Sequence, residues 1–328
     1  MAHTDKTIIN KAVTAGTMAL FVLTTLFVVI DSLQAHTESF ETLRPTHGHS
    51  LPTDSLHLQM PQLTAEDTAR ARQVLPHSFR HTAPNLVNRP EALQRFYEML
   101  TRGERPVRIL QLGDSHVAAK SFPNAVRDAL QKAWGRAESD STGRGISYDY
   151  MARNGATIHK FLTAERLALI SRKQPDLIIL SFGTNEAHGM GYCEAQHDEE
   201  LTAALNALRE ACPEATLLLT TPPGDYLSRR HVSYRRSRGR RRRVVRYTSQ
   251  PNPMSMRCAA LIDSVGRQQN LAVWDLNTIA GGEVAVRNYV ADGLMNADRV
   301  HFTPQGYTLH GQWLAQALIT ALGNGRPE

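Results

Sequence analysis

The chain has 328 residues, of which 41% are hydrophobic and 21% charged, and its formal net charge is +6. This is enough apolar material for a large core, whereas 21 glycines and 16 prolines are too few for a collagen-like or low-complexity chain. The composition therefore excludes a fibrous or intrinsically disordered protein, and we find no internal repeat of the kind that builds solenoids or propellers.

The first predicted element is a run without charged residues at positions 12–30, between Lys11 and Asp31. About 20 apolar residues span a bilayer, whereas the core of a signal peptide is usually about 7–15 residues long. The length favours an uncleaved signal anchor in the inner membrane, and a cleaved signal peptide within residues 1–35 remains the alternative. Under either interpretation the rest of the chain is expected in the periplasm or cell envelope.

Residues 36–90 are polar, rich in Thr, His and Pro, and they lack a periodic apolar pattern. This composition predicts a mostly extended polar tether. The scattered leucines and the methionine of residues 51–63 leave docking on the catalytic domain as the alternative. The folded domain is predicted to occupy residues 91–328.

From residue 107 onward, short apolar runs alternate with stretches of helical periodicity. Strands are predicted at 107–112, 146–151, 176–182, 215–220 and 271–275, and helices at 118–134, 164–171, 199–211, 256–268 and 306–322. The third strand is almost continuously apolar, as in a strand that is buried on both faces. This alternation predicts a three-layer α/β/α sandwich, flavodoxin-like, with a five-stranded parallel sheet.

Polar residues follow three of these strands and precede the last helix. Ser115 follows the first strand, Gly155 the second and Asn185 the third, so all three should lie at the carboxyl edge, where open parallel sheets bind ligands. Asp298 and His301 come just before the last predicted helix, where a turn can aim both side chains over the same edge. The set contains every group that an ester hydrolase needs.

The residue types suggest a role for each group. Ser115 is the candidate nucleophile, His301 its general base and Asp298 the group that orients the imidazole. The backbone N–H groups of Ser115 and Gly155 and the side-chain amide of Asn185 are the candidate oxyanion hole. This chemistry needs no cofactor, and no pair of histidines has a convincing ligand spacing, so we expect no metal.

These motifs resemble those of the SGNH hydrolases, the GDSL-type esterases, over about residues 107–322. The first motif reads Gly113-Asp114-Ser115-His116 where the family usually has Gly-Asp-Ser-Leu, the third reads Gly183-Thr184-Asn185-Glu186 where Gly-x-Asn-Asp is usual, and the last runs from Asp298 to His301. The Gly-Asp-Ser-His variant resembles periplasmic peptidoglycan O-acetylesterases of this family. The resemblance implies a serine carboxylic ester hydrolase that acts on an O-acetylated glycan.

Three further residues of these motifs, beside the candidate catalytic groups, are also considered. Asp114 is expected to cap backbone amides in the nucleophile turn, and Glu186 to orient amides of neighbouring loops. For His116 the sequence leaves a substrate contact and a packing role equally open.

The chain has only three cysteines, an odd number, so it is not a disulfide scaffold. One bridge, between Cys193 and Cys258 with Cys212 unpaired, remains open on the predicted positions of these residues. Three unpaired thiols are the alternative.

Ten arginines fall within an insertion at residues 229–246, between the fourth strand and the next helix. Without them the formal net charge of +6 would be negative, so the basicity of the chain is local. We expect an anionic surface, either a cell-wall polymer or lipid phosphates, to be contacted by Arg240, Arg241, Arg242 and Arg243. The alternative is a solvated two-stranded flap, and export of the chain argues against nucleic-acid binding.

The function predicted from these features is hydrolysis of O-acetyl esters on a cell-envelope glycan, and peptidoglycan is the preferred candidate for that glycan. The same site could serve a lysophospholipase, a thioesterase or a glycan O-acetyltransferase. Polar residues in the segments 187–194 and 222–226 favour a sugar over a lipid. A non-catalytic glycan-binding module is the alternative from another class, and the intact set of site residues argues against it.

Overall fold

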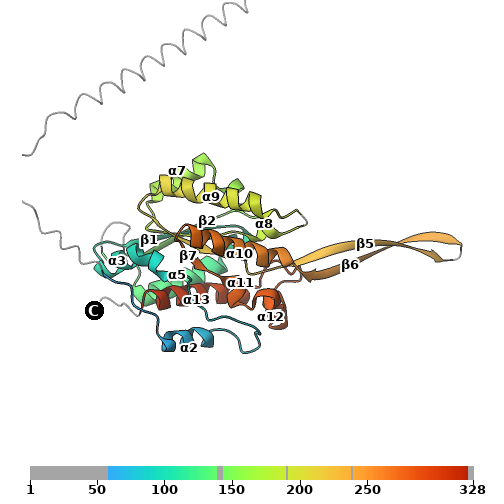
Figure 1. The fold of residues 1–328 in the computed structure, drawn as a ribbon, viewed down its shortest axis with the longest axis horizontal. Coiled ribbons are helices and arrows are strands. Elements are labelled where there is room, and N and C mark those ends of the chain that lie inside the picture. Colours follow the sequence, from blue (N-terminus) through green and yellow to red (C-terminus); the bar gives the residue numbers. More distant parts are fainter. Residues whose placement is uncertain (1–57, 139–142, 190, 238, 324–328) are drawn as a thin grey trace, which may run out of the picture. The chain divides into compact units, whose positions relative to one another are not determined.

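The computed structural model describes residues 58–138, 143–189, 191–237 and 239–323, which all fall in the second of two units, Leu58–Glu328. Its centre is a five-stranded sheet in the order β2-β1-β3-β4-β7, and every strand pairs in parallel (Figure 1). The strands are β1 (Val107–Gly113), β2 (Ile146–Ala152), β3 (Leu177–Ser181), β4 (Thr216–Thr220) and β7 (Ala272–Trp274). The predicted five-stranded parallel sheet is confirmed.

Helices cover both faces of this sheet (Figure 1). One apolar core lies between the sheet and a layer that includes α3 (Gln94–Arg102), α5 (Ser121–Trp134), α12 (Ala285–Ala291) and α13 (Pro304–Ala321), and α2 (Ala65–Gln73) packs on α13. The opposite core is formed with α7 (Ala164–Lys173), α9 (Glu194–Ala211) and α10 (Pro253–Gln268). Successive residues of a strand enter opposite cores, as Ile179 and Leu180 of β3 do, because side chains alternate across a pleated sheet. The predicted three-layer sandwich is therefore confirmed.

Short elements connect these layers. They are η1 (Pro90–Leu93), α4 (Ser115–Ala118), α6 (Ile158–Phe161), α8 (Thr184–Ala187), α11 (Leu276–Ile279) and η2 (Gly282–Val284). The helix predicted at 118–134 corresponds to α5, which begins only at Ser121 because Lys120 adopts a positive φ of 67°. Before this break lies the separate short helix α4, which follows β1 and begins at Ser115.

The tether predicted over residues 36–90 is wrong for its described part. α2 packs against α13, and the side chains of Phe79 and Val87 are buried in the same core. The side chain of Asn85 is fully buried and accepts a hydrogen bond from Nε1 of Trp274 (2.9 Å). A few isolated large side chains anchor this segment, so it has no apolar period that the sequence could reveal. The folded domain thus begins well before residue 91.

The expected insertion forms a separate antiparallel hairpin of β5 (Tyr226–Ser237) and β6 (Arg240–Pro251). Figure 1 shows it leaving the body of the domain. Described side chains from Ser228 to Gln250 are exposed, except that of Val244, which is half-buried. The two-stranded flap that the sequence offered as an alternative is therefore the structure of this segment.

The three cysteines are unpaired, so the alternative of a Cys193–Cys258 bridge is wrong. The Sγ atom of Cys258 instead lies 3.5 Å from the carbonyl oxygen of Gly183 and 3.7 Å from Nδ1 of His197. Cys193 is exposed, whereas Cys212 and Cys258 are buried.

No helix within the described ranges is long and apolar enough to cross a bilayer. The anchor predicted at residues 12–30 lies outside the described residues, so it stays a prediction.

Candidate active site

The predicted nucleophile occupies a tight turn between β1 and α4. Ser115 is the first residue of α4, and Asp114 is its N-cap. The Oδ1 atom of Asp114 accepts a hydrogen bond from the backbone N–H of His116 (2.9 Å). Burial raises the pKa of Asp114 to about 7, although this hydrogen bond and the charge of His301 act in the opposite direction. Asp114 thus caps the turn, as expected from the sequence.

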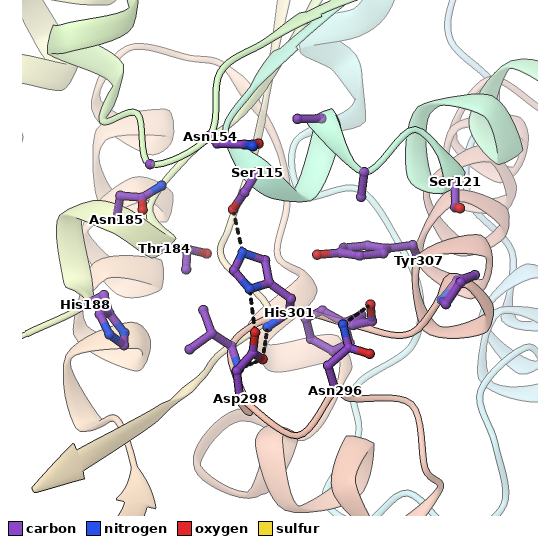
Figure 2. Close-up of a pocket in the computed structure, with 16 residues that line it drawn as sticks. Ser115, Ser121, Asn154, Thr184, Asn185, His188, Asn296, Asp298, His301 and Tyr307 are labelled. Atoms are coloured by element: carbon purple, nitrogen blue, oxygen red, sulfur yellow. Dashed lines mark hydrogen bonds and ion pairs between the residues drawn. The ribbon is translucent and has the colours of Figure 1, made fainter.

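The structure brings Ser115, His301 and Asp298 into one hydrogen-bonded chain (Figure 2). The Nε2 atom of His301 lies 3.0 Å from Oγ of Ser115, and Nδ1 of His301 lies 2.9 Å from Oδ2 of Asp298. A carboxylate at Nδ1 requires a proton there, so the neutral ring presents its Nε2 lone pair to the serine hydroxyl. This is the geometry that a general base needs.

Asp298 and His301 share one short loop that holds its own shape. The second carboxylate oxygen of Asp298 accepts hydrogen bonds from the backbone N–H groups of Val300 (3.0 Å) and His301 (2.9 Å). Burial raises the pKa of Asp298, but these hydrogen bonds outweigh it and hold the pKa below its usual range. Arg299 adopts a positive φ of 56°, and the N–H of Asn296 donates to the carbonyl oxygen of His301 (2.8 Å), which closes the loop.

The two other oxyanion-hole candidates, Gly155 and Asn185, line the same pocket as Ser115. Gly155 has a φ of +69°, a conformation that a side chain would strain although no atom would contact its Cβ. The amide nitrogen of Asn185 donates to Oδ2 of Asp114 (3.1 Å) and to the carbonyl oxygen of Ala156 (3.0 Å). These bonds orient the Asn185 amide, and an oxyanion would have to share one of its two hydrogens.

Replacing Asn185 by alanine is expected to lower kcat on an aryl acetate by roughly 10²–10³, because one preorganised donor to the oxyanion is lost. Initial rates on 4-nitrophenyl acetate measure this effect. Asn154→Ala is the matched control, because Asn154 lines the same pocket from an exposed position. Equal rates for the two variants would remove Asn185 from the oxyanion hole.

Glu186 ties together the loops that follow β2 and β3. Its two carboxylate oxygens accept hydrogen bonds from the backbone N–H groups of Ile158 (2.7 Å) and Gly183 (2.9 Å). Burial raises the pKa of Glu186 to about 7, against the effect of these bonds. Gly183 has a φ of +122°, and a Cβ there would lie 2.9 Å from Cδ of Pro222. Glu186 therefore orients loop amides, as expected from the sequence.

Of the two roles left open for His116, the structure favours packing over a substrate contact, because only 6% of this residue is exposed. Its Nδ1 atom lies 3.1 Å from the hydroxyl of Tyr307, and its ring centroid lies 5.7 Å from that of His301. Burial lowers the pKa of His116 to about 3, so the ring is neutral. His116 packs beneath the site and contacts Tyr307, and only Tyr307 of this pair lines the pocket.

The candidate triad opens into a pocket of about 810 Å³. Ten of the sixteen residues that line it have polar side chains, although apolar atoms form more of the lining surface; these ten are labelled in Figure 2, namely Ser115, Ser121, Asn154, Thr184, Asn185, His188, Asn296, Asp298, His301 and Tyr307. Within the described part of the chain, no group of three or more His, Cys, Asp or Glu side chains could hold a metal ion.

The structure does not bring Arg240, Arg241, Arg242 and Arg243 to this pocket. They lie on β6 beside the turn of the hairpin, at the end remote from its base. The base itself adjoins the site, because the N–H of Tyr226 donates to the carbonyl oxygen of Arg299 (2.9 Å).

Sequence reasoning missed one buried partner of the site. Asp225 contacts Nδ1 of His188, which lines the pocket. Its position after Pro222-Pro223-Gly224, beyond the fourth strand, placed it at the carboxyl edge, but nothing in the sequence indicated its burial.

Comparison with known proteins gives one match to a family model and several similar solved structures. A family model described as the GDSL-like lipase/acylhydrolase family matches residues 111–309. A search of curated proteins finds no match. Among solved structures, a peptidoglycan O-acetylesterase is similar with a TM-score of 0.55 and 18% identity, over 70% of this chain and 95% of that one.

Two further structures are similar at lower TM-scores. An acetyl xylan esterase gives a TM-score of 0.47 at 16% identity, over 63% of this chain and 98% of that one. A lipase/acylhydrolase from Enterococcus faecalis gives 0.45 at 22% identity, over 65% and 95% of the two chains. At 18% identity, the likeness to the peptidoglycan O-acetylesterase shows a shared fold.

Proposed function

The chain belongs to the GDSL-like lipase/acylhydrolase family, and from this premise we propose that it is a serine esterase that removes O-acetyl groups from a cell-envelope glycan, with peptidoglycan as the first candidate. The observation that carries the proposal is the hydrogen-bonded chain from Ser115 through His301 to Asp298 at the floor of an open, polar pocket.

The reaction follows from the positions of these groups. Oγ of Ser115 attacks the acetyl carbonyl carbon while Nε2 of His301 takes the hydroxyl proton, and the carbonyl oxygen becomes an oxyanion. Collapse of this intermediate breaks the ester bond, and His301 returns the proton to the departing sugar hydroxyl. Water then attacks the acetyl-serine with His301 again as base, which releases acetate and restores Ser115.

The pocket supports a sugar ester better than a long acyl chain. A long acyl chain needs a continuous apolar channel, whereas ten of the sixteen residues that line this pocket carry hydroxyl, amide, carboxylate or imidazole groups that can bind a sugar. One solved structure of similar fold is a peptidoglycan O-acetylesterase, which supports the choice of polymer. A lysophospholipase, a thioesterase and a glycan O-acetyltransferase use the same triad and are the alternatives that substrate assays must separate.

The proposal is tested by acetate release from O-acetylated peptidoglycan, measured beside 4-nitrophenyl acetate and beside Ser115→Ala. Release from the polymer that depends on Ser115 is the expected result. Cleavage of the aryl ester alone would retain the mechanism and reject the polymer. No turnover of either ester would favour a transferase or a glycan-binding module.

We place the protein outside the cytoplasm, in the periplasm or cell envelope. The charge-free run at residues 12–30 supports export, and a peptidoglycan substrate lies in the same compartment. Cell fractionation with an antibody to the domain tests this placement, and recovery of the protein in the cytoplasm would reject it.

The arginine hairpin is proposed to bind an anionic cell-wall polymer near the site. The exposed arginines of β6 form a strongly positive surface without neighbouring carboxylates on the hairpin, which favours polyanions in the surrounding medium. The base of the hairpin adjoins the Asp298 loop, so polymer held along the strands would lie close to the pocket.

Replacing Arg240, Arg241, Arg242 and Arg243 together by Gln is expected to lower kcat/KM on insoluble peptidoglycan several-fold more than on 4-nitrophenyl acetate. The reason is loss of four charges that concentrate the enzyme on the polymer, and the difference should shrink as salt is added. The matched control replaces the same four residues by Lys, which keeps the charge. Equal losses on both substrates, or equal losses for the Gln and Lys variants, would contradict electrostatic docking.

A further inference from the structure

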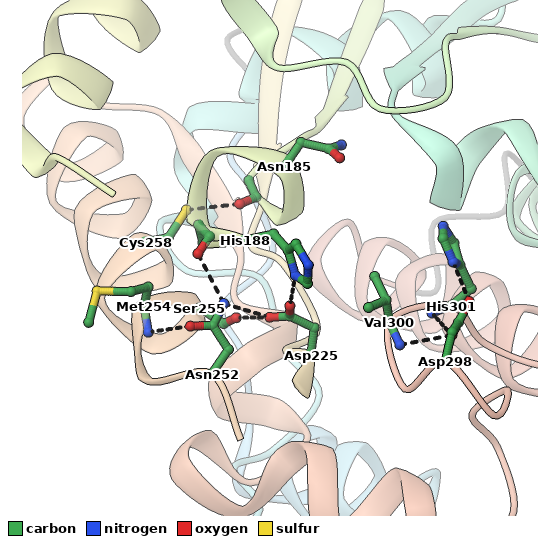
Figure 3. Close-up of polar contacts among 12 residues, drawn as sticks. Asn185, His188, Asp225, Asn252, Met254, Ser255, Cys258, Asp298, Val300 and His301 are labelled. Carbon is green, nitrogen blue, oxygen red and sulfur yellow. Dashed lines mark hydrogen bonds and ion pairs between the residues drawn. The ribbon is translucent and has the colours of Figure 1, made fainter. Parts of the chain in front are cut away.

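A second histidine paired with a carboxylate lines the pocket. His188 follows α8, three residues after Asn185, and its side chain is 43% exposed. Its Nδ1 atom contacts Oδ2 of Asp225 in a short hydrogen bond. Figure 3 shows this pair across the site from Asp298 and His301. The arrangement repeats the carboxylate–imidazole half of the triad, and no step of the proposed reaction uses it.

The carboxylate of this pair is more deeply buried than that of the triad. Asp225 is 0% exposed, and its Oδ1 atom accepts hydrogen bonds from Nδ2 of Asn252 (2.9 Å) and Oγ of Ser255 (2.5 Å). Asn252 is fixed in turn, because its Oδ1 accepts from the N–H of Met254 (3.0 Å) and its Nδ2 also donates to the carbonyl oxygen of Ala187 (3.0 Å). A buried carboxylate is costly unless its partners satisfy it, and here Asn252 and Ser255 hold Asp225 against one half-exposed ring.

The network also decides what His188 presents to a ligand. An ionised carboxylate can only accept hydrogen bonds, as Asp225 does from Asn252 and Ser255, so the contact with Nδ1 of His188 requires a proton on Nδ1. In the neutral ring Nε2 is then an acceptor, and the ring that carries it is 43% exposed and lines the pocket. A fixed acceptor at the rim fits a ligand that offers an O–H donor, as the free hydroxyls of a sugar do.

We propose that His188, oriented by Asp225, accepts a hydrogen bond from a free hydroxyl of the substrate and so selects esters of carbohydrates over simple esters. His188 is a specificity-determining residue, and Asp225 is a positioning residue that acts through it. The inference rests on the proposed function, since it names how the same pocket recognises the alcohol part of its ester.

The test compares two small esters on the full-length protein: a mono-O-acetylated methyl glucoside, which has free hydroxyls, and 4-nitrophenyl acetate, which has none. For His188→Ala, the ratio of kcat/KM on the glucoside to that on the aryl ester is expected to fall roughly tenfold, the effect of one lost hydrogen bond. His159→Ala is the matched control, because His159 is exposed on α6 and does not line the pocket; its ratio should equal that of the wild type.

A second measurement needs no substrate. In protein labelled with ¹⁵N-histidine, the neutral His188 ring is expected to be protonated at Nδ1. In Asp225→Asn the proton should move to Nε2, because Oδ1 of the new amide must still accept from Asn252 and Ser255, which turns its NH₂ group toward His188. Asp225→Asn is also expected to raise the KM for hydrolysis of the glucoside. A thermal unfolding curve of the same variant shows whether it is folded.

Three outcomes overturn the inference: an unchanged ratio in His188→Ala, a wild-type protein that does not cleave the glucoside, or a neutral wild-type ring protonated at Nε2. If the proposal that peptidoglycan is the substrate were wrong, the results would differ from these three outcomes. Peptidoglycan would then release no acetate, while the glucoside ratio and the ring protonation would still follow the expected pattern.

Discussion

Replacing Ser115 by alanine is expected to lower kcat on 4-nitrophenyl acetate by roughly 10⁶, to the level left by the oxyanion hole and binding alone. The variant removes the only atom that can form the acetyl-enzyme. Oγ of Ser115 has His301 as its hydrogen-bond partner, and that side chain is 40% exposed, so the loss should cost little stability. The thermal unfolding midpoint is therefore expected to stay near that of the wild type.

Ser121→Ala is the control for this experiment. Ser121 lines the same pocket at the start of α5, and within the described part of the chain no hydrogen bond joins its side chain to a histidine. Its kcat should remain within a few-fold of the wild type. A Ser115→Ala protein that retains near-wild-type turnover would reject Ser115 as the nucleophile, whatever the identity of the substrate.

Replacing Asp298 by asparagine is expected to lower kcat by roughly 10⁴ with the loop intact. The carboxylate fixes the proton of His301 on Nδ1 and stabilises the imidazolium that forms during attack. An amide in its place can keep the hydrogen bonds from Val300 and His301 through its oxygen, but it then turns its NH₂ group to Nδ1. The ring would carry its proton on Nε2 and could not accept one from Ser115.

The double variant Ser115→Ala, Asp298→Asn serves as the internal check. Groups that act as one unit give losses that do not add, so the double variant should be no slower than Ser115→Ala alone. A loss of less than tenfold in Asp298→Asn, or losses that add in the double variant, would show that Asp298 does not orient the base. Initial rates on the aryl ester measure both quantities.

The sheet and the triad could be predicted from the sequence because their signals are local. β3 is buried along its whole length and reads as a continuous apolar run. Asp298 and His301 are three residues apart, so one loop must carry both, and the positions of Ser115 and Asn185 after strands fix the edge at which they meet. Chain order and strand ends were therefore enough to assemble the site.

Other features depend on contacts between distant segments. Phe79 and Val87 are isolated buried residues in an otherwise polar stretch, so no apolar periodicity in the sequence predicts their burial. The burial of His116 depends on Tyr307, which lies 191 residues away in the chain. Asp225 meets His188 and Asn252 only once three loops have come together at the sheet edge. No local pattern encodes such pairings, and the structure was needed to reveal them.

The central claim is that His301 activates Ser115, and labelling with a fluorophosphonate tests it most directly. The account predicts covalent modification of the wild-type protein on the peptide that contains Ser115, and a labelling rate reduced by several orders of magnitude in His301→Ala, because the reagent needs an activated serine. An unlabelled wild-type protein, or equal labelling rates in the wild type and His301→Ala, would contradict it.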